Sequence, residues 1–127
     1  MRSDATIDTV VRRMRLERIG AVIISPDGKS VIGILSERDI LHALAEHGTA
    51  LLALKAEDLM TREVVTCSLE DTLQSVMVKM TQRRIRHLPV VEQEQLVGII
   101  SIGDVVKHTL MEMRDESEAL HDYIQTA

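Results

Sequence analysis

Residues 32–41 read IGILSERDIL, and residues 97–106 read VGIISIGDVV. The two stretches align without a gap at an offset of 65 residues, and each runs from an apolar segment through a Ser to an Asp three positions later. This pattern is typical of a buried strand that passes directly into a capped helix. Because the pattern occurs twice, the sequence predicts two copies of one structural unit.

The repeat extends upstream at an offset of 66 residues, so the copies differ in length by one residue in a turn. The matched pairs are Thr6 and Thr72, Val10 and Val76, Met14 and Met80, and Ile19 and Ile85. Each copy predicts a helix, two strands joined by a turn, and a second helix, which makes the fold α/β. The predicted strands are residues 20–24 and 31–35 in the first copy, and residues 85–91 and 96–100 in the second.

The start of the second copy has features of its own. Ser68 and Asp71 predict a helix cap, with Leu69 on the apolar face of the helix that follows. Residues 63–67 read EVVTC and predict a short opening strand. At an offset of 66 its counterpart lies before Met1, so the first copy lacks this strand. Truncation of a longer chain and replacement by a neighbouring chain both explain the difference.

These boundaries predict three parts: a first repeat over residues 1–48, a connector over residues 49–62, and a second repeat over residues 63–127. We expect Gly48 to end the last helix of the first repeat. The final helix carries an apolar stripe at alternating spacings of four and three residues. The stripe consists of Val106, Leu110, Met113, Ser117, Leu120 and Ile124, opposite Asp115, Glu116 and Glu118.

Composition excludes several classes of function. The net charge of −5 is spread along the chain, and Tyr123 is the sole aromatic residue, so neither DNA nor single-stranded nucleic acid is an expected partner. The sequence has no apolar run that spans a membrane and no signal peptide pattern. A single cysteine, Cys67, excludes an internal disulfide, which fits a reducing, cytoplasmic location.

The strongest candidate sites are the two predicted helix starts. Ser36 and Ser101 stand at the cap positions, with Asp39 and Asp104 at the third helical positions. A plain capping box explains this pattern. The pattern also fits a ligand site, because free backbone amides at a helix start bind anions and a carboxylate accepts hydrogen bonds from a diol. Gly103 favours close approach of a ligand in the second copy, where the first copy has Arg38.

The ordered motifs resemble the cystathionine-β-synthase (CBS) domain pair. The resemblance covers nearly the whole chain except the absent first strand. It is carried by residues 83–91 (RRIRHLPVV), 96–105 (LVGIISIGDV), 58–61 (DLMT), 19–22 (IGAV) and 33–39 (GILSERD). It implies tandem β-α-β-β-α units with pseudo-two-fold symmetry, often paired into a homodimer, which bind AMP, ADP, ATP, NAD or S-adenosylmethionine in clefts between the repeats.

The resemblance also implies which residues bind the nucleotide. In the second repeat Asp104 takes the ribose, Ser101 with the amides of Ile102 and Gly103 takes phosphate, and Arg86 and His87 reach toward phosphate. The adenine is lined by Thr66, Leu88 and Pro89. In the first repeat the matching set is Gly20, Ala21, Ser36, Arg38 and Asp39, but no strand corresponds to Thr66. That second cleft is therefore the less complete of the two.

The sequence favours a regulatory, nucleotide-binding module over an enzyme, with a homodimer and a regulated protein partner as expected associations. A dimerisation module that has lost its ligand is the main alternative. A thiol hydrolase that uses Cys67 and His87 ranks below both, because no pattern pairs a base with the thiol. The remaining histidines share no spacing that would bind a metal; they are His42, His47, His108 and His121.

Overall fold

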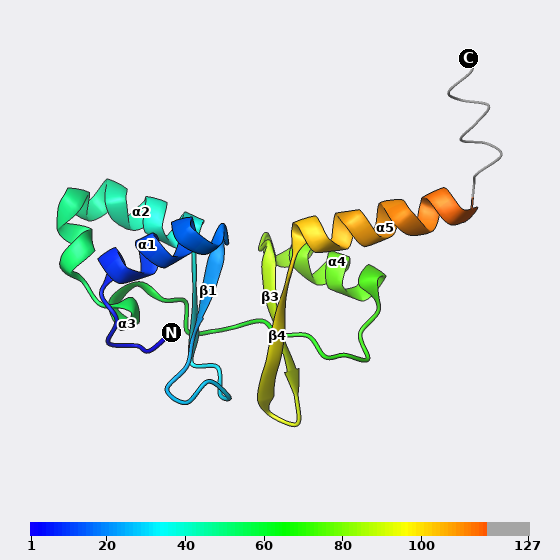
Figure 1. Ribbon diagram of the computed structural model, residues 1–127, viewed down its shortest axis with the longest axis horizontal. Coiled ribbons are helices and arrows are strands. Elements are labelled where there is room, and N and C mark those ends of the chain that lie inside the picture. Colours follow the sequence, from blue (N-terminus) through cyan, green and yellow to red (C-terminus); the bar gives the residue numbers. More distant parts are fainter. Residues whose placement is uncertain (117–127) are drawn as a thin grey trace, which may run out of the picture.

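The computed structural model describes residues 1–116. In chain order, its elements are α1 (Ile7–Glu17), β1 (Ala21–Ile24), β2 (Gly33–Ser36), α2 (Glu37–His47), the 3₁₀ helix η1 (Gly48–Ala53), α3 (Ala56–Leu59), α4 (Leu73–Arg83), β3 (His87–Glu92), β4 (Gln95–Ser101) and α5 (Ile102–Glu116). Strands β1 and β2 form one antiparallel sheet, and β3 and β4 form another. Figure 1 shows the sheets side by side in the middle of the molecule, with α1, α2 and α3 beside one and α4 and α5 beside the other.

The predicted duplication is confirmed residue by residue. Ala21 pairs with Ser36 and His87 pairs with Ser101, so both sheets have the same register at their helix-proximal ends. The Glu37 amide donates to the Gly20 carbonyl (3.0 Å), as the Ile102 amide donates to the Arg86 carbonyl (2.8 Å). Helices α1 and α4 both end on a residue in the left-handed conformation, Arg18 and Arg84 respectively.

The structural equivalence of the two repeats extends back to Met1, the first residue of the sequence. The Ser25 amide donates to the Met1 carbonyl at 2.8 Å, as the Val91 amide donates to the Cys67 carbonyl at 2.8 Å. Met1 therefore takes the place that Cys67 has in the second repeat. The opening strand predicted over residues 63–67 is present only as an isolated parallel bridge between Cys67 and Val90.

The predicted start of α4 is corrected by four residues. The Thr72 hydroxyl accepts from the Ser75 amide (3.1 Å) and begins the helix, whereas the Ser68 amide donates to the Asp71 carboxylate (2.8 Å) in a turn before it. Leu69 lies in that turn and is 72% exposed, so it is not on the buried face. Gly48 ends α2 as predicted, with a positive φ of 61°. Ser117, Leu120 and Ile124 of the predicted stripe lie outside the described residues.

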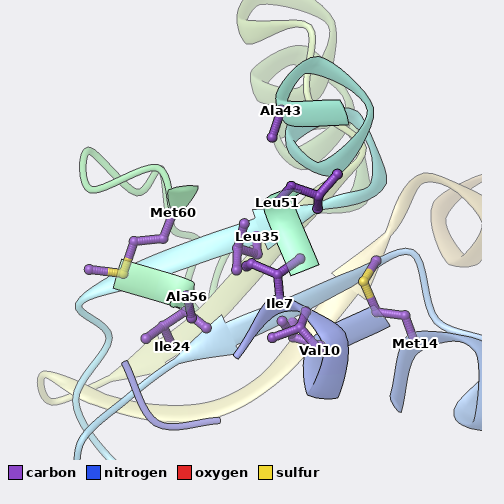
Figure 2. Close-up of a cluster of buried hydrophobic side chains, with 10 residues drawn as sticks. Ile7, Val10, Met14, Ile24, Leu35, Ala43, Leu51, Ala56 and Met60 are labelled. Carbon is purple, nitrogen blue, oxygen red and sulfur yellow. The ribbon is translucent and has the colours of Figure 1, made fainter. Parts of the chain in front are cut away.

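Each repeat has its own apolar core between its helices and its sheet. In the first repeat Ile7 and Val10 of α1 lie against Ile24 and Leu35, and all four are fully buried (Figure 2). In the second repeat Leu88 and Val105 are the fully buried centre. The two cores leave the helix starts and the strand ends at the boundary between the repeats.

Candidate functional site

Both helix starts carry the predicted capping box, with nearly the same geometry. Asp39 Oδ2 accepts from the Ser36 amide (2.9 Å) and hydroxyl (3.1 Å), and Asp104 Oδ2 accepts from the Ser101 amide (3.0 Å) and hydroxyl (2.9 Å). Hydrogen bonds from the Ser101 amide and hydroxyl hold the pKa of Asp104 below its ordinary value. In each capping box Oδ2 of the aspartate accepts the hydrogen bonds of the cap, so Oδ1 can bind other partners.

A large cavity lies between the repeats, beside Asp39, and has a volume of about 650 Å³. This volume falls within the range of ordinary small-molecule sites. The Thr61 hydroxyl donates to Asp39 Oδ1 at 3.4 Å, so the connector closes one side of the cavity. Its lining residues come from both repeats and from the connector, which makes the cavity a product of their association.

The chemistry of the lining is mixed, with an excess of cationic groups. The cations are Arg38, Arg83, Arg84 and Arg86; the carboxylates are Glu37, Asp39 and Glu63; and the apolar lining residues are Ile34, Leu41, Val64, Val65 and Ile85. Guanidinium groups bind phosphate and carboxylate oxygens through paired N–H donors. The cavity therefore suits a ligand with an anionic end and a flat apolar part.

His87 lies where the two repeats meet. A side chain at Gly20 would place its Cβ 3.0 Å from the His87 ring and 3.3 Å from Glu37 Oε1, so Gly20 lies in close contact with both side chains. Burial lowers the pKa of His87 below its ordinary value of 6.5, opposed by the nearby charges of Glu37 and Asp104 and assisted by that of Arg86. The imidazole is therefore mostly neutral at pH 7.

A pH dependence of stability follows from His87. Because its folded pKa is lowered, the unfolded chain binds more protons than the folded chain between the two pKa values, and stability falls as pH drops below about 6.5. We expect His87→Gln to make the midpoint of urea unfolding less sensitive to pH between about 7 and 5. Unfolding curves at four pH values for both proteins measure this. Parallel pH profiles would contradict the assignment.

Arg38 lines both the large cavity and a second one of about 360 Å³. Its guanidinium donates to the Arg84 carbonyl at 3.4 Å, and Arg38, Arg84 and Arg86 line both cavities. The second repeat has Gly103 at the equivalent position. The first helix start therefore presents a side-chain cation where the second presents bare backbone.

The structure brings together members of both predicted residue sets. The large cavity is lined by Arg86 and His87 from the first set and by Gly20, Ser36, Arg38 and Asp39 from the second. Ile102 lines the smaller cavity, and Thr66, Ser101, Gly103 and Asp104 line neither. Leu88, Pro89 and Ala21 are buried in the protein interior. The set that the sequence treats as less complete thus lies at the larger cavity, and a ligand role for Asp104 stays a prediction.

Several lining residues were not predicted from the sequence. Thr61, Glu63, Val64 and Val65 belong to the connector and the segment after it. One signal was present, because Thr61 ends the DLMT motif between the repeats. Arg83 and Arg84 enter the sequence analysis only within the motif RRIRHLPVV, although the cluster of arginines around residue 85 indicates an anion site.

Cys67 does not line this cavity. Cys67 is 4% exposed, and burial raises the pKa of its thiol, so it is protonated at pH 7. Within residues 1–116 no group of His, Cys, Asp and Glu is arranged to hold a metal ion. None of the described helices is both long and apolar enough to cross a membrane.

The fold and the cavity define a class of protein, a tandem-repeat α/β module with a ligand-sized cavity between its repeats. A family model for the CBS domain matches residues 1–46 and 56–110, and the chain belongs to the CBS domain family. A CBS-domain containing protein of Agrobacterium tumefaciens, ATU1752, has a similar crystal structure. It is 40% identical with a TM-score of 0.81, and the match covers 84% of this chain and 80% of that one.

Two further relatives are a solved structure and a plant protein. The CBS domain pair of protein MJ0100, solved with 5′-methylthioadenosine and S-adenosyl-L-methionine, is 25% identical with a TM-score of 0.79 over 87% of this chain and 86% of that one. The Arabidopsis thaliana protein CBSX3, named as mitochondrial, is 35% identical over 97% of this chain. The chain spans 62% of the length of that plant relative.

Proposed function

We propose that the chain is a regulatory module that binds an adenosine nucleotide, namely AMP, ADP, ATP or NAD, in the large cavity between its repeats. The observation that carries the proposal is the cavity itself, which is lined from both repeats by three carboxylates, four guanidinium groups and apolar side chains. The adenosine ligands named for the MJ0100 structure support the ligand class. No catalytic role is proposed for any lining residue.

In this proposal each part of the ligand contacts a different wall of the cavity. Asp39 Oδ1 and the Thr61 hydroxyl, which lie 3.4 Å apart, bind the ribose diol. Val64 and Val65 provide the apolar surface for adenine. Arg38 and Arg86, which line the cavity from different repeats, bind the phosphate oxygens. A ligand held this way contacts both repeats, so its occupancy stabilises one arrangement of the two and can be transmitted to a partner protein.

Isothermal calorimetry with adenosine, AMP, ADP, ATP and NAD tests the proposal, with GTP as the control for base recognition. We expect saturable binding of at least one phosphate-bearing adenosine compound at one site per chain, without turnover of the compound. Uniform absence of binding to the whole panel would favour a module that only associates with protein. Hydrolysis or transfer of the nucleotide would favour an enzyme.

Salt is expected to weaken nucleotide binding and to leave adenosine binding nearly unchanged. The reason is that Arg38 and Arg86 bind the phosphates through partly exposed charges, which added ions screen at a Debye length of about 8 Å at 0.15 M ionic strength. Titrations at low and high sodium chloride concentration compare AMP with adenosine. Equal responses of the two compounds to salt would refute the assignment of phosphate to these arginines.

We also propose a homodimer, as the sequence predicts, but with the apolar surface on α2 and α5. Leu41 and its equivalent Val106 are 64% and 47% exposed, and Leu44 and Leu110 are 45% and 60% exposed on the same helices. Apolar side chains gathered on two helices are typical of an interface. Sedimentation equilibrium at micromolar concentration should give twice the chain mass, and Leu41→Glu with Leu110→Glu should give the monomer mass.

A further inference from the structure

Two hydrogen bonds join the first repeat directly to the second in the part of the chain that the structure describes. The Arg38 guanidinium donates to the Arg84 carbonyl (3.4 Å), and the Leu96 amide donates to the Lys29 carbonyl (2.6 Å). The second bond connects the loop between β1 and β2, residues 25–32, to the start of β4. It is a backbone bond and the shorter of the two, so this loop is a direct structural link between the repeats.

The two links lie at opposite ends of the sheets. Figure 1 shows the β1–β2 loop and the β3–β4 turn together at the end away from α2 and α5. Leu96 lies five residues before Ser101 on β4, which corresponds to roughly 17 Å along the strand. Neither Lys29 nor Leu96 lines the large or the small cavity. A link at each end fixes the orientation of one sheet relative to the other, whereas a single link allows the repeats to pivot about it.

Asp27 holds the loop in the conformation that presents the Lys29 carbonyl. Its Oδ1 accepts from the amides of Lys29 (2.8 Å) and Ser30 (2.9 Å), and from the hydroxyls of Ser25 (3.2 Å) and Ser30 (2.9 Å). Hydrogen bonds from the Ser30 and Lys29 amides hold the pKa of Asp27 well below its ordinary value. The Ser25 hydroxyl also accepts from the Gly28 amide (2.8 Å), and Ser25 is 5% exposed. Side chains of the loop itself therefore order it.

The hairpin of the second repeat has a much shorter connection. Only residues 93 and 94 join β3 to β4, and both Gln93 and Glu94 have a positive φ, 50° and 64°. Such a tight turn is sufficient to reverse the chain between two strands. The additional length of residues 25–32 and the bonds of Asp27 are thus not needed to form a hairpin, and the contact that they make possible is the bond to Leu96.

We propose that the β1–β2 loop, ordered by Asp27, clamps the two repeats in the arrangement that forms the large cavity, and thereby controls nucleotide affinity from outside that cavity. Asp27 is a positioning residue, because it acts through the Lys29 carbonyl and does not line the cavity. Loss of the clamp lowers the fraction of molecules in the binding arrangement, and the apparent dissociation constant rises by the same factor. By linkage, a bound nucleotide strengthens the Lys29–Leu96 bond in return. The effect on affinity rests on the proposed function, whereas the clamp itself does not.

Amide hydrogen exchange tests the clamp in the full chain without any ligand. Asp27→Ala should speed exchange of the Leu96 amide at least about fivefold. The Cys67 amide, bonded to the Pro89 carbonyl (3.0 Å) within the second repeat, should exchange as in wild type. Asp27→Asn keeps an acceptor oxygen for the backbone amides of the loop and should restore slow exchange at Leu96. Equal acceleration at Leu96 and Cys67 would show a general loss of stability and would overturn the proposal.

Calorimetric titration with AMP and with ATP tests the effect on affinity. Asp27→Ala should weaken binding about threefold to tenfold, the size of one net backbone hydrogen bond. Lys29→Ala is the matched control, because it removes the side chain but keeps the carbonyl that accepts from Leu96, and it should bind within about twofold of wild type. Saturation with nucleotide should slow exchange of the Leu96 amide in wild type and not in Asp27→Ala.

The results distinguish a failure of the clamp from a failure of nucleotide binding. If wild type binds neither nucleotide, the proposed function is wrong, and exchange of the Leu96 amide still decides whether the clamp exists. If wild type binds a nucleotide and Asp27→Ala binds it equally well, the clamp does not control the cavity and the inference alone is overturned. An equal loss of affinity in Lys29→Ala would assign the effect to the Lys29 side chain instead of its carbonyl, which would also overturn it.

Discussion

Gly33→Val is expected to lower the free energy of unfolding by about 1–3 kcal/mol, whereas Gly98→Val should change it by less than about 0.5 kcal/mol. The two glycines occupy equivalent positions in equivalent sheets, yet Met60 Cβ lies 3.1 Å from a Cβ built at Gly33 and no atom lies within 4 Å of one built at Gly98. Met60 is only 8% exposed, so its side chain has little room to move aside.

Urea unfolding and thermal unfolding, both followed by circular dichroism, compare the two variants with wild type. In the thermal experiment Gly33→Val should lower the melting temperature by several degrees, as about 1 kcal/mol shifts a domain of this size by roughly 3–5 °C. Valine is itself favourable in a strand because it is β-branched. Gly98→Val measures this favourable effect alone, without the clash with Met60. Equal destabilisation by both substitutions would mean that the connector does not pack over Gly33 as described.

The second large effect concerns the two helix caps. Asp39→Asn should weaken binding of the adenosine nucleotide by about tenfold to a hundredfold, since a hydrogen bond to a charged group contributes about 1.5–3 kcal/mol. The remaining amide oxygen of Asn can still accept from the Ser36 amide, which keeps the cap, while Oδ1 beside Thr61 is lost as a charged acceptor.

Asp104→Asn is the matched control, because Asp104 makes the same cap bonds to Ser101 but lines neither cavity. We expect it to alter nucleotide affinity less than threefold. Calorimetric titration of both variants with the same nucleotide gives the comparison. A larger loss for Asp104→Asn than for Asp39→Asn would move the ligand to the second helix start, where the resemblance places it.

The duplication and the caps could be predicted from the sequence because they depend on local patterns. Ser36 with Asp39 and Ser101 with Asp104 fix the strand-to-helix junctions through bonds that span three residues. The start of α4 was misplaced because Ser68 and Asp71 form a similar local turn four residues before the true cap, Thr72. The Ser68–Asp71 turn and the Thr72 cap use the same kind of hydrogen bond, so the sequence pattern alone does not show which of them begins the helix.

The site was less predictable because it depends on how the repeats meet. Val64 and Val65 line the cavity, although the resemblance assigns the adenine to Thr66. Arg86 and His87 belong to the second repeat but line the cavity beside Asp39 of the first. No periodicity within either repeat encodes that contact, since it comes from the packing of one sheet beside the other.

A crystal structure of the protein grown with saturating AMP or ATP tests the central claim most directly. We predict electron density for the nucleotide in the cavity between the repeats, with the ribose hydroxyls within hydrogen-bond distance of Asp39 and the phosphates against Arg86. Density for the nucleotide at another place, or an empty cavity at a concentration that saturates binding in solution, would contradict the claim.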